Sequence, residues 1–550
     1  MRKIILFIFI FFSILATVLF AELPLQRGPF PGQSGMPRSA PQGDNFKFDR
    51  KTAQGPRPEF YENNKADLSL AAKHINSPFG FANTWATDST PMYNYPDYIN
   101  NLKDLGVYWV RVAGFYSLNW NWSRMRSMDG RWNNLDAIVK ELQFNSINPL
   151  MGINLGPEET PDMDEKRRPG RGGMEGRKGR RPGDKLPSDL EAYSRFIQSA
   201  VERYDMDGAE DMPGLRFPVE YYMIGNEPDV PVFWADTPEN YAVLVRTTYL
   251  AIKRAFPEAK VVVGGSAGSL YEYLRAGQYP PKGLNTSLRA DSRKGDGFFV
   301  DFLRHLRKIS GQEDYRDLIM DFHFYGNAGD WRVIEYFVRY IRNIEDDLGF
   351  AHFSVWVTET GTFSGKISGM VKNDLARITG QMGKTLSQDE AAQAGELVKR
   401  YIFGAVNGVE KLFWFTIKGG SNPIYFENTG ILDSHSGKKL SYYAYKKMVE
   451  ILEGSDWKNI QTIQKDGAYI FKFLKSGKPV WVAWSEERGL KEATISGIPS
   501  KQAKITRLGQ YGSGKDVASY EGAFRIEVRP VVNRQINIEL GDSPQFIEAR

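Results

Sequence analysis

The chain has 550 residues, enough for one large domain and a second smaller one, because a single hydrophobic core stops growing near about 250 to 300 residues. Hydrophobic residues make up 41% and charged residues 25%, which excludes disorder of the whole chain. The net charge of +5 is too small to indicate a nucleic-acid partner, and the absence of cysteine excludes disulfides, thiolate nucleophiles and cysteine-ligated zinc.

The first 73 residues have the features of an export signal and a linker. Met1, Arg2 and Lys3 precede an apolar stretch over residues 4–20, so residues 1–21 are predicted to be a secretory signal peptide. An uncleaved membrane anchor is the alternative, because Leu19 stands where a small residue is preferred and the stretch is just long enough to span a bilayer. Residues 22–73 are rich in Pro, Gly, Asn and Gln and are predicted to be a disordered linker. Either form places the folded part outside the cytoplasm, so the protein is expected to be secreted, periplasmic or on the cell surface.

Short apolar runs alternate with helical patterns over residues 74–453. Eight strands followed by helices in this order predict a (β/α)8 TIM barrel, an α/β fold whose active site forms at the carboxyl ends of the strands. The predicted strands cover residues 79–85, 107–113, 149–155, 219–224, 260–264, 318–325, 354–358 and 411–416. The predicted helices include residues 96–105, 190–204, 237–256, 298–309, 331–348, 388–407 and 441–452.

Two further segments differ from this pattern. Residues 454–550 read as short alternating strands, such as 468–474 and 479–485, and predict a small C-terminal β-sandwich domain. An insertion at 157–187 is acidic in its first part and rich in arginine and glycine in its second. We interpret it as a solvated excursion; a lid with affinity for acidic glycans is the alternative. No nucleic-acid recognition fold accompanies the arginine–glycine tract.

Two glutamates stand at the ends of predicted strands. Glu227 lies between Asn226 and Pro228, directly after an apolar run, and apolar surroundings raise the pKa of a carboxyl group as a general acid requires. The amide of Asn226 is placed to bond the sugar hydroxyl next to the reacting carbon. Glu359 follows the strand at 354–358 and is the candidate nucleophile. A nucleophilic carboxylate needs a cationic neighbour, and Arg111 in an equally apolar strand needs a carboxylate partner. A purely structural ion pair of Arg111 with another acid is the alternative.

Other chemistries find few residues to support them. The five histidines contain no pair at metal-binding spacing, and the glycine-rich run at 263–268 lacks the lysine of a phosphate-binding loop. We therefore expect neither a metal nor another cofactor.

Together these residues resemble the clan A glycoside hydrolases. Their sequence motifs are most similar to those of family 39, with family 5 as the next candidate. The resemblance covers about residues 78 to 450. It implies that Glu227 is the acid/base, Glu359 the nucleophile and the anomeric configuration retained. It also implies that Tyr325 bonds the nucleophile, His323 lines the substrate site and Trp414 forms a stacking floor for a sugar. Family 5 is weakened because Gly152, Ile153, Asn154 and Leu155 stand where it carries a histidine.

The predicted function is exported, retaining hydrolysis of O-glycosidic bonds in polysaccharides or oligosaccharides, with a carbohydrate substrate and with the N-terminal segment as the alternative membrane tether. A retaining pair places its carboxyl groups about 5 to 5.5 Å apart, against about 6.5 to 9.5 Å for an inverting pair. Two other functions are compatible with the residues: a non-catalytic glycan-binding protein on the same barrel, and a surface-tethered protein that docks a partner through residues 157–187. Trp85, Trp234 and Trp331 are further candidates for sugar stacking.

Overall fold

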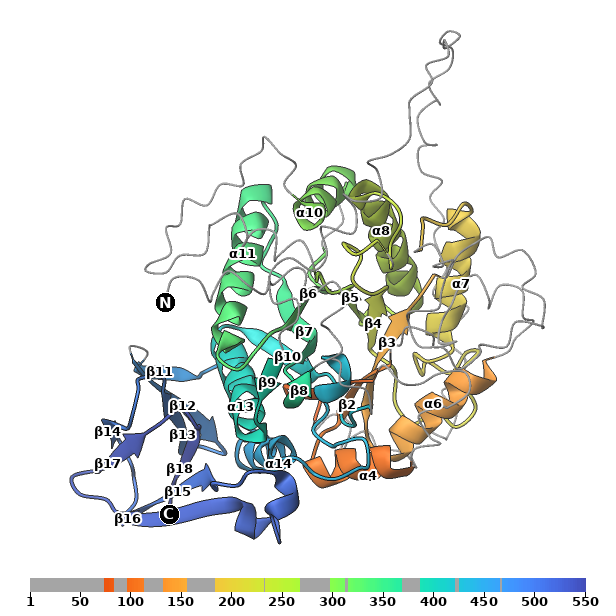
Figure 1. The fold of residues 1–550 in the computed structure, drawn as a ribbon. Coiled ribbons are helices and arrows are strands. Elements are labelled where there is room, and N and C mark those ends of the chain that lie inside the picture. The colour runs from red at the N-terminus through yellow and green to blue at the C-terminus, as the bar shows by residue number, and fades with distance from the viewer. Residues whose placement is uncertain are drawn as a thin grey trace, which may run out of the picture.

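A computed structural model describes residues 74–83, 96–112, 132–155, 184–231, 233–267, 297–311, 315–367, 386–420, 425–464 and 467–550. Parallel strands form a closed barrel in the order β1-β10-β7-β6-β5-β4-β3-β2, which confirms the predicted TIM barrel (Figure 1). The strands are β1 Phe79–Asn83, β2 Trp109–Val112, β3 Asn148–Ile153, β4 Tyr221–Ile224, β5 Lys260–Val263, β6 Leu318–Tyr325, β7 Ser354–Gly361 and β10 Val409–Trp414.

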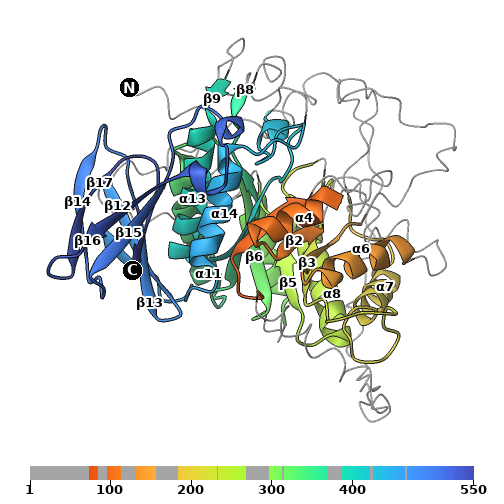
Figure 2. The same ribbon diagram turned by 90° about the horizontal axis from the view of Figure 1, so that it is seen from below.

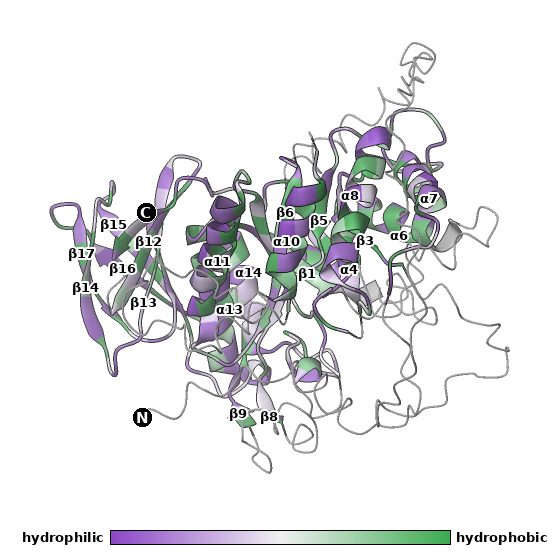
Figure 3. Cartoon of the chain, turned by 90° about the horizontal axis from the view of Figure 1, so that it is seen from above, coloured by the Kyte–Doolittle hydropathy of each residue, from purple (hydrophilic) through white to green (hydrophobic). Residues whose placement is uncertain are grey.

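Helices surround the barrel and cover its outer face. Figure 3 shows hydrophilic and hydrophobic turns interleaved on helices such as α10 and α11, as expected where one face packs on strands and the other meets solvent. Local signals explain where α8 begins: Thr237 accepts from the backbone N–H of Asn240, and Pro238 occupies the first turn. The helices are α4 Pro96–Leu105, α6 Asn133–Phe144, α7 Leu190–Glu202, α8 Pro238–Ala255, α10 Phe298–Ile309, α11 Val333–Leu348, α13 Glu390–Val406 and α14 Leu440–Leu452; α6 is not among those named from the sequence.

Two hydrophobic layers stabilise the barrel, because successive side chains on a strand point to opposite faces. One fills the interior and includes Trp109, Trp356 and Phe413, whose rings pack against one another. The other lies between strands and helices and includes Trp414, the neighbour of Phe413 in sequence. This alternation decides which residues near the end of β10 can face the site.

The chain ends in two antiparallel sheets that pack beside α13 and α14 (Figure 2). Trp331 joins this unit to the barrel: its indole donates to Glu486 Oε1 at 2.8 Å and packs against Trp484 at 5.3 Å between ring centroids. The predicted sandwich is therefore confirmed, and its first hairpin turns at Ser476 and Gly477, both at positive φ. One sheet contains β11 Gln461–Gln464, β12 Ala468–Lys475, β13 Lys478–Ser485, β18 Gln545–Ala549, β15 Gln502–Leu508 and β16 Phe524–Pro530, and the other β14 Lys491–Ser496 and β17 Gln535–Leu540.

Three predictions fall wholly or mostly outside the described residues: the signal peptide at 1–21, the linker at 22–73 and the insertion at 157–187. Of the insertion, residues 184–187 are described, and Asp184 accepts from the backbone N–H of Leu155 at 3.1 Å. Within the described ranges, no helix combines the length and apolar composition needed to cross a bilayer.

Candidate active site

The barrel brings the two predicted glutamates together. Glu227 lies three residues beyond the end of β4, and Glu359 lies within β7, which continues past its predicted end to Gly361. A carboxylate oxygen of Glu227 and one of Glu359 lie within 4.8 Å of one another. Both side chains are largely buried, with residue exposures of 8% and 5%. The site is therefore a pair of buried acids at the carboxyl end of the barrel.

Glu227 is held in an unusual backbone conformation. Its φ is 41°, in the left-handed region that side chains other than glycine enter at a cost of about 1 to 3 kcal/mol. Gly225, two residues earlier, also has positive φ, so the chain turns sharply between β4 and the glutamate. Tyr241 on α8 fixes the start of this turn, because its hydroxyl donates to Ile224 O at 3.0 Å. The strained backbone of this turn therefore orients the side chain of Glu227.

Burial raises the pKa of the Glu227 carboxyl, because a charged carboxylate loses hydration there. The neighbouring Glu359 raises this pKa further, whereas a hydrogen bond and charge from His323 lower it in part. The net effect of these interactions is that the pKa of Glu227 is raised. Glu227 therefore keeps its proton to higher pH than an exposed glutamate.

Glu359 has a different set of neighbours. Arg111 on β2 donates from Nη1 to Oε2 at 2.6 Å, and the hydroxyl of Tyr325 on β6 donates to Oε1. Both oxygens are acceptors, the arrangement that an ionised carboxylate needs. The structure thus shows the contact with Arg111 that the sequence predicted. Glu359 is thus held by an arginine and a tyrosine, whereas the cation beside Glu227 is a histidine.

Asn226 is oriented by the same arginine. Arg111 donates from Nη2 to Asn226 Oδ1, so the amide nitrogen of Asn226 is the group left to donate to a ligand. Asn226 is half-buried beside Glu227. Arg111 therefore fixes a donor as well as a carboxylate.

His323 does not line the substrate site, as the resemblance implied, but lies behind both glutamates at 1% exposure. Its Nδ1 is 2.9 Å from Glu227 Oε1 and 3.9 Å from Glu359 Oε2. Its Nε2 is 3.1 Å from Thr358 Oγ1, and Thr358 in turn donates to Asp321. His323 pairs with Glu359 in the register of β6 and β7 and faces the barrel interior, but Glu227, Glu359 and Thr358 enclose its ring.

The pKa of His323 is raised to about 10. Burial opposes the charged imidazolium, but the carboxylates of Glu359, Asp321 and Glu227 around it outweigh that effect. The ring is therefore cationic at neutral pH and donates to Glu227 Oε1, which leaves Oε2 for the proton of the acid. Sequence reasoning missed Asp321, although an aspartate in the apolar run at 318–325 is itself a signal of a buried charge network.

The prediction that Trp414 forms a stacking floor is wrong. Its side chain is fully buried in the layer between barrel and helices, and its indole donates to Thr429 O at 3.0 Å. Strand alternation turns the ring outward and gives the interior position to Phe415. Trp234 and Trp331 are also buried, at 4% and 0% exposure, so neither offers a face to a sugar. Trp85 lies outside the described residues.

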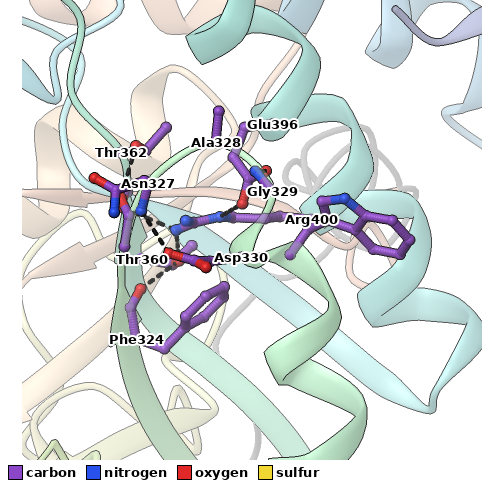
Figure 4. A network of polar contacts seen from close by, with 12 residues as sticks. Phe324, Asn327, Ala328, Gly329, Asp330, Thr360, Thr362, Glu396 and Arg400 are labelled. Carbon is purple, nitrogen blue, oxygen red and sulfur yellow. Dashed lines mark hydrogen bonds and ion pairs between the residues drawn. The ribbon is translucent and has the colours of Figure 1, made fainter. Parts of the chain in front are cut away.

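A second polar network, also missed from the sequence, lies on the outer side of β7 (Figure 4). Arg400 on α13 donates to Glu396 Oε1 at 2.8 Å, Thr360 Oγ1 at 2.8 Å and Gly361 O at 2.9 Å. Its guanidinium lies 4.1 Å from the ring centroid of Phe324 on β6. The network ties together the ends of the two strands that carry Tyr325 and Glu359.

Glu227, His323 and Glu359 also satisfy the spacing of a metal site, each offering one atom within 4.8 Å of the others. The donor set fits an ion poorly, because the guanidinium of Arg111 already neutralises Glu359 at 2.6 Å. His323 is also engaged by Glu227 and Thr358 through its two ring nitrogens. The cluster therefore fits proton and covalent chemistry better than metal chemistry.

No protein-family model and no curated protein matches the chain. Solved structures do match. A family 39 glycoside hydrolase from the gut symbiont Bacteroides cellulosilyticus superposes with a TM-score of 0.54 at 16% identity, covering 86% of this chain and 81% of that one. A monomeric β-xylosidase from Caulobacter crescentus gives 0.54 at 13% identity, covering 86% and 95%. A family 51 α-L-arabinofuranosidase from Bifidobacterium longum gives 0.51 at 13% identity, covering 87% and 96%. At these identities the matches show a shared fold, and at that level they confirm the resemblance to family 39 and its clan.

Proposed function

We propose that this protein is an exported retaining glycoside hydrolase that cleaves O-glycosidic bonds of polysaccharides or oligosaccharides. The observation that carries the proposal is the glutamate pair: two carboxylate oxygens within 4.8 Å, one acid with a raised pKa and one held by Arg111 and Tyr325. This close approach supports a retaining mechanism, since an inverting pair must leave room between its carboxyl groups for a water.

The first chemical step forms a covalent intermediate. Glu359 attacks the anomeric carbon, and the bond from that carbon to the leaving oxygen breaks as Glu227 transfers its proton to that oxygen. His323, which donates to Glu227 Oε1, keeps the acidic proton on the other oxygen. The amide of Asn226 bonds the neighbouring hydroxyl, a contact that strengthens in the transition state.

The second step reverses the roles. Glu227, now ionised, takes a proton from water, and the water oxygen attacks the anomeric carbon and displaces Glu359. The product leaves with the configuration it had in the substrate. Arg111 and Tyr325 then receive a free carboxylate again and hold it for the next cycle.

The solved structures with the same fold include a β-xylosidase and an α-L-arabinofuranosidase, so pentose-containing glycans are the first substrates to try. A panel of oligosaccharides and polysaccharides, read by mass spectrometry, tests the proposal with wild type beside Glu359→Gln and Glu227→Gln. Glu258→Gln, an exposed glutamate before β5 at the opposite end of the barrel, is the matched control. We expect products from wild type and the control, and from neither site variant.

Two other outcomes correspond to the other functions. Glycan binding by folded wild-type protein without any hydrolysis would replace the proposal with a non-catalytic binding protein. Hydrolysis that survives deletion of residues 158–185, together with loss of association with a surface partner, would add the docking function to it.

A further inference from the structure

Four aromatic side chains lie together beside the glutamates, and we call them the aromatic rim: Tyr325, Phe415, Tyr425 and Phe426. The ring centroid of Phe426 is 4.9 Å from that of Tyr325, 6.1 Å from that of Phe415 and 5.4 Å from that of Tyr425, all edge to face. Tyr325 is the residue whose hydroxyl donates to Glu359. A single tyrosine ring therefore separates Phe426 from the proposed nucleophile.

Phe426 differs from its neighbours in exposure. Phe415 and Tyr425 are 5% exposed, whereas Phe426 is 39% exposed. Leaving a large apolar face in water forgoes burial energy of about 25 cal/mol per Å². Phe426 belongs to the loop after β10, on the carboxyl side of the barrel, where loops form the binding site of this fold.

The backbone around Phe426 is fixed by several hydrogen bonds. Thr429 Oγ1 donates to Phe426 O at 2.7 Å, and the next residue, Glu427, accepts from Gly420 N at 2.9 Å. The hydroxyl of Tyr425 bonds the backbone at the ends of β6 and β7, including Gly361 O at 3.1 Å. An exposed ring on so well-anchored a turn is set in place before any ligand arrives, which lowers the entropic cost of binding.

We propose that the exposed face of Phe426 is a stacking platform for the apolar face of a sugar ring, in a subsite next to the bond that is cleaved. The proposal rests on the proposed function. The ligand class is a neutral pentose or hexose unit of a glycan, whose C–H groups pack on an aromatic face. Tyr325 connects this platform to Glu359, because its ring contacts Phe426 and its hydroxyl donates to the glutamate.

Substitution at Phe426 tests the platform. In wild-type background, Phe426→Ala should raise KM about 5- to 20-fold with a smaller change in kcat, because a stacked sugar is held equally in ground and transition states. Phe426→Trp should stay within about threefold of wild type, since it keeps an aromatic face. The control is Phe144→Ala on α6. Phe144 is 71% exposed, and its replacement should change neither KM nor kcat.

A binding assay separates the platform from catalysis. Affinity for xylotetraose, arabinotetraose and cellotetraose is measured by calorimetric titration of the Glu359→Gln protein. Adding Phe426→Ala should lower this affinity by the same factor, and adding Phe144→Ala should leave it unchanged. Phe426→Leu keeps the apolar packing on Tyr325 without an aromatic face, so it serves if the alanine variant unfolds. We expect it to weaken binding too.

The outcomes distinguish the two proposals. Measurable glycan binding that stays within about twofold of the parent in Phe426→Ala or Phe426→Leu overturns the platform and leaves the hydrolase intact. Binding that depends on Phe426 while wild type hydrolyses none of the panel overturns the hydrolase and keeps the platform. The absence of both binding and hydrolysis overturns both.

Discussion

Two buried arginine–glutamate pairs lie on opposite sides of strand β7. The pair of Arg111 and Glu359 faces the barrel interior at its open end, where Glu359 retains 5% exposure. The pair of Arg400 and Glu396 lies on the helix side and is sealed, at 0% and 2% exposure. Each pair has a fixed arginine that also bonds a neighbouring polar group.

The surroundings of each ion pair, rather than its presence, indicate what the pair does. A sealed pair has no route to a substrate, and its hydrogen bonds to Thr360 and Gly361 fix strands. An open pair, set beside a second acid with a raised pKa, can exchange protons and attack a carbon. The same residue types thus serve structure on one side of β7 and, in the proposed function, chemistry on the other.

The largest expected contrast is between the two glutamates. Glu359→Gln should lower kcat/KM by at least about a thousandfold, because the nucleophile disappears while the amide oxygen can still accept from Tyr325 or Arg111. Glu396→Gln should leave the kinetics nearly unchanged and lower the urea midpoint. Kinetics and urea unfolding of both variants measure this, and equal activity losses would erase the distinction.

Replacing the two arginines should show which pair supports stability and which supports activity. Arg400→Met leaves Glu396 buried without its partner and should cost about 3 to 5 kcal/mol of unfolding free energy. Arg111→Met should cost less, since Glu359 keeps its bond from Tyr325, but should reduce kcat about a hundredfold. Chemical denaturation and steady-state kinetics at one pH give both numbers. A more stable Arg400→Met variant would show that the sealed pair is not needed for the fold.

The pH dependence of kcat/KM should change when His323 is replaced. Its charge and hydrogen bond lower the pKa of Glu227, so His323→Gln should raise that pKa further. Because the acid must be protonated, activity falls as pH rises through this pKa, and the alkaline limb of the kcat/KM profile should move to higher pH in the variant. A limb that stays in place or moves to lower pH would contradict the assignment of Glu227 as the acid.

The charge of His323 should also make stability depend on pH. The pKa of His323 rises from 6.5 to about 10 on folding, so its charged form contributes stability that is complete below pH 6.5 and lost as pH rises toward about 10. The stability gap between wild type and His323→Gln should therefore narrow from pH 6.5 to about 10. Urea unfolding across this range measures the gap; a gap that widens would show that the ring is neutral in the folded protein.

The sequence predicts the barrel well because apolar runs and amphipathic helices alternate regularly, and it predicts the two glutamates because each directly follows such a run. It also leads to Arg111, since a charge in an apolar strand requires a partner. The pair of Glu396 and Arg400 on α13 was not predicted, because helix-borne charges are usually solvated and only packing shows these to be buried.

The errors at Trp414 and His323 have different causes. A one-residue difference in strand register moves a side chain to the other face, and sequence resemblance does not fix that register, so Trp414 turns outward. His323 faces the barrel interior beside Glu359, and only the packing of the site shows that its ring is enclosed. Phe426 had no signal at all: a phenylalanine in a loop is prominent only when the fold places it against Tyr325.

The central claim is that Glu359 forms a covalent bond to the sugar. The direct measurement is mass spectrometry of proteolytic peptides after wild-type protein is incubated with activated 2-deoxy-2-fluoro glycosides of xylose, arabinose and glucose, which slow release of the intermediate. We expect a glycosyl group on the peptide that contains Glu359 and none in Glu359→Gln. A label on Glu227 instead, or hydrolysis of the natural substrate with inverted configuration and no label, would contradict the account.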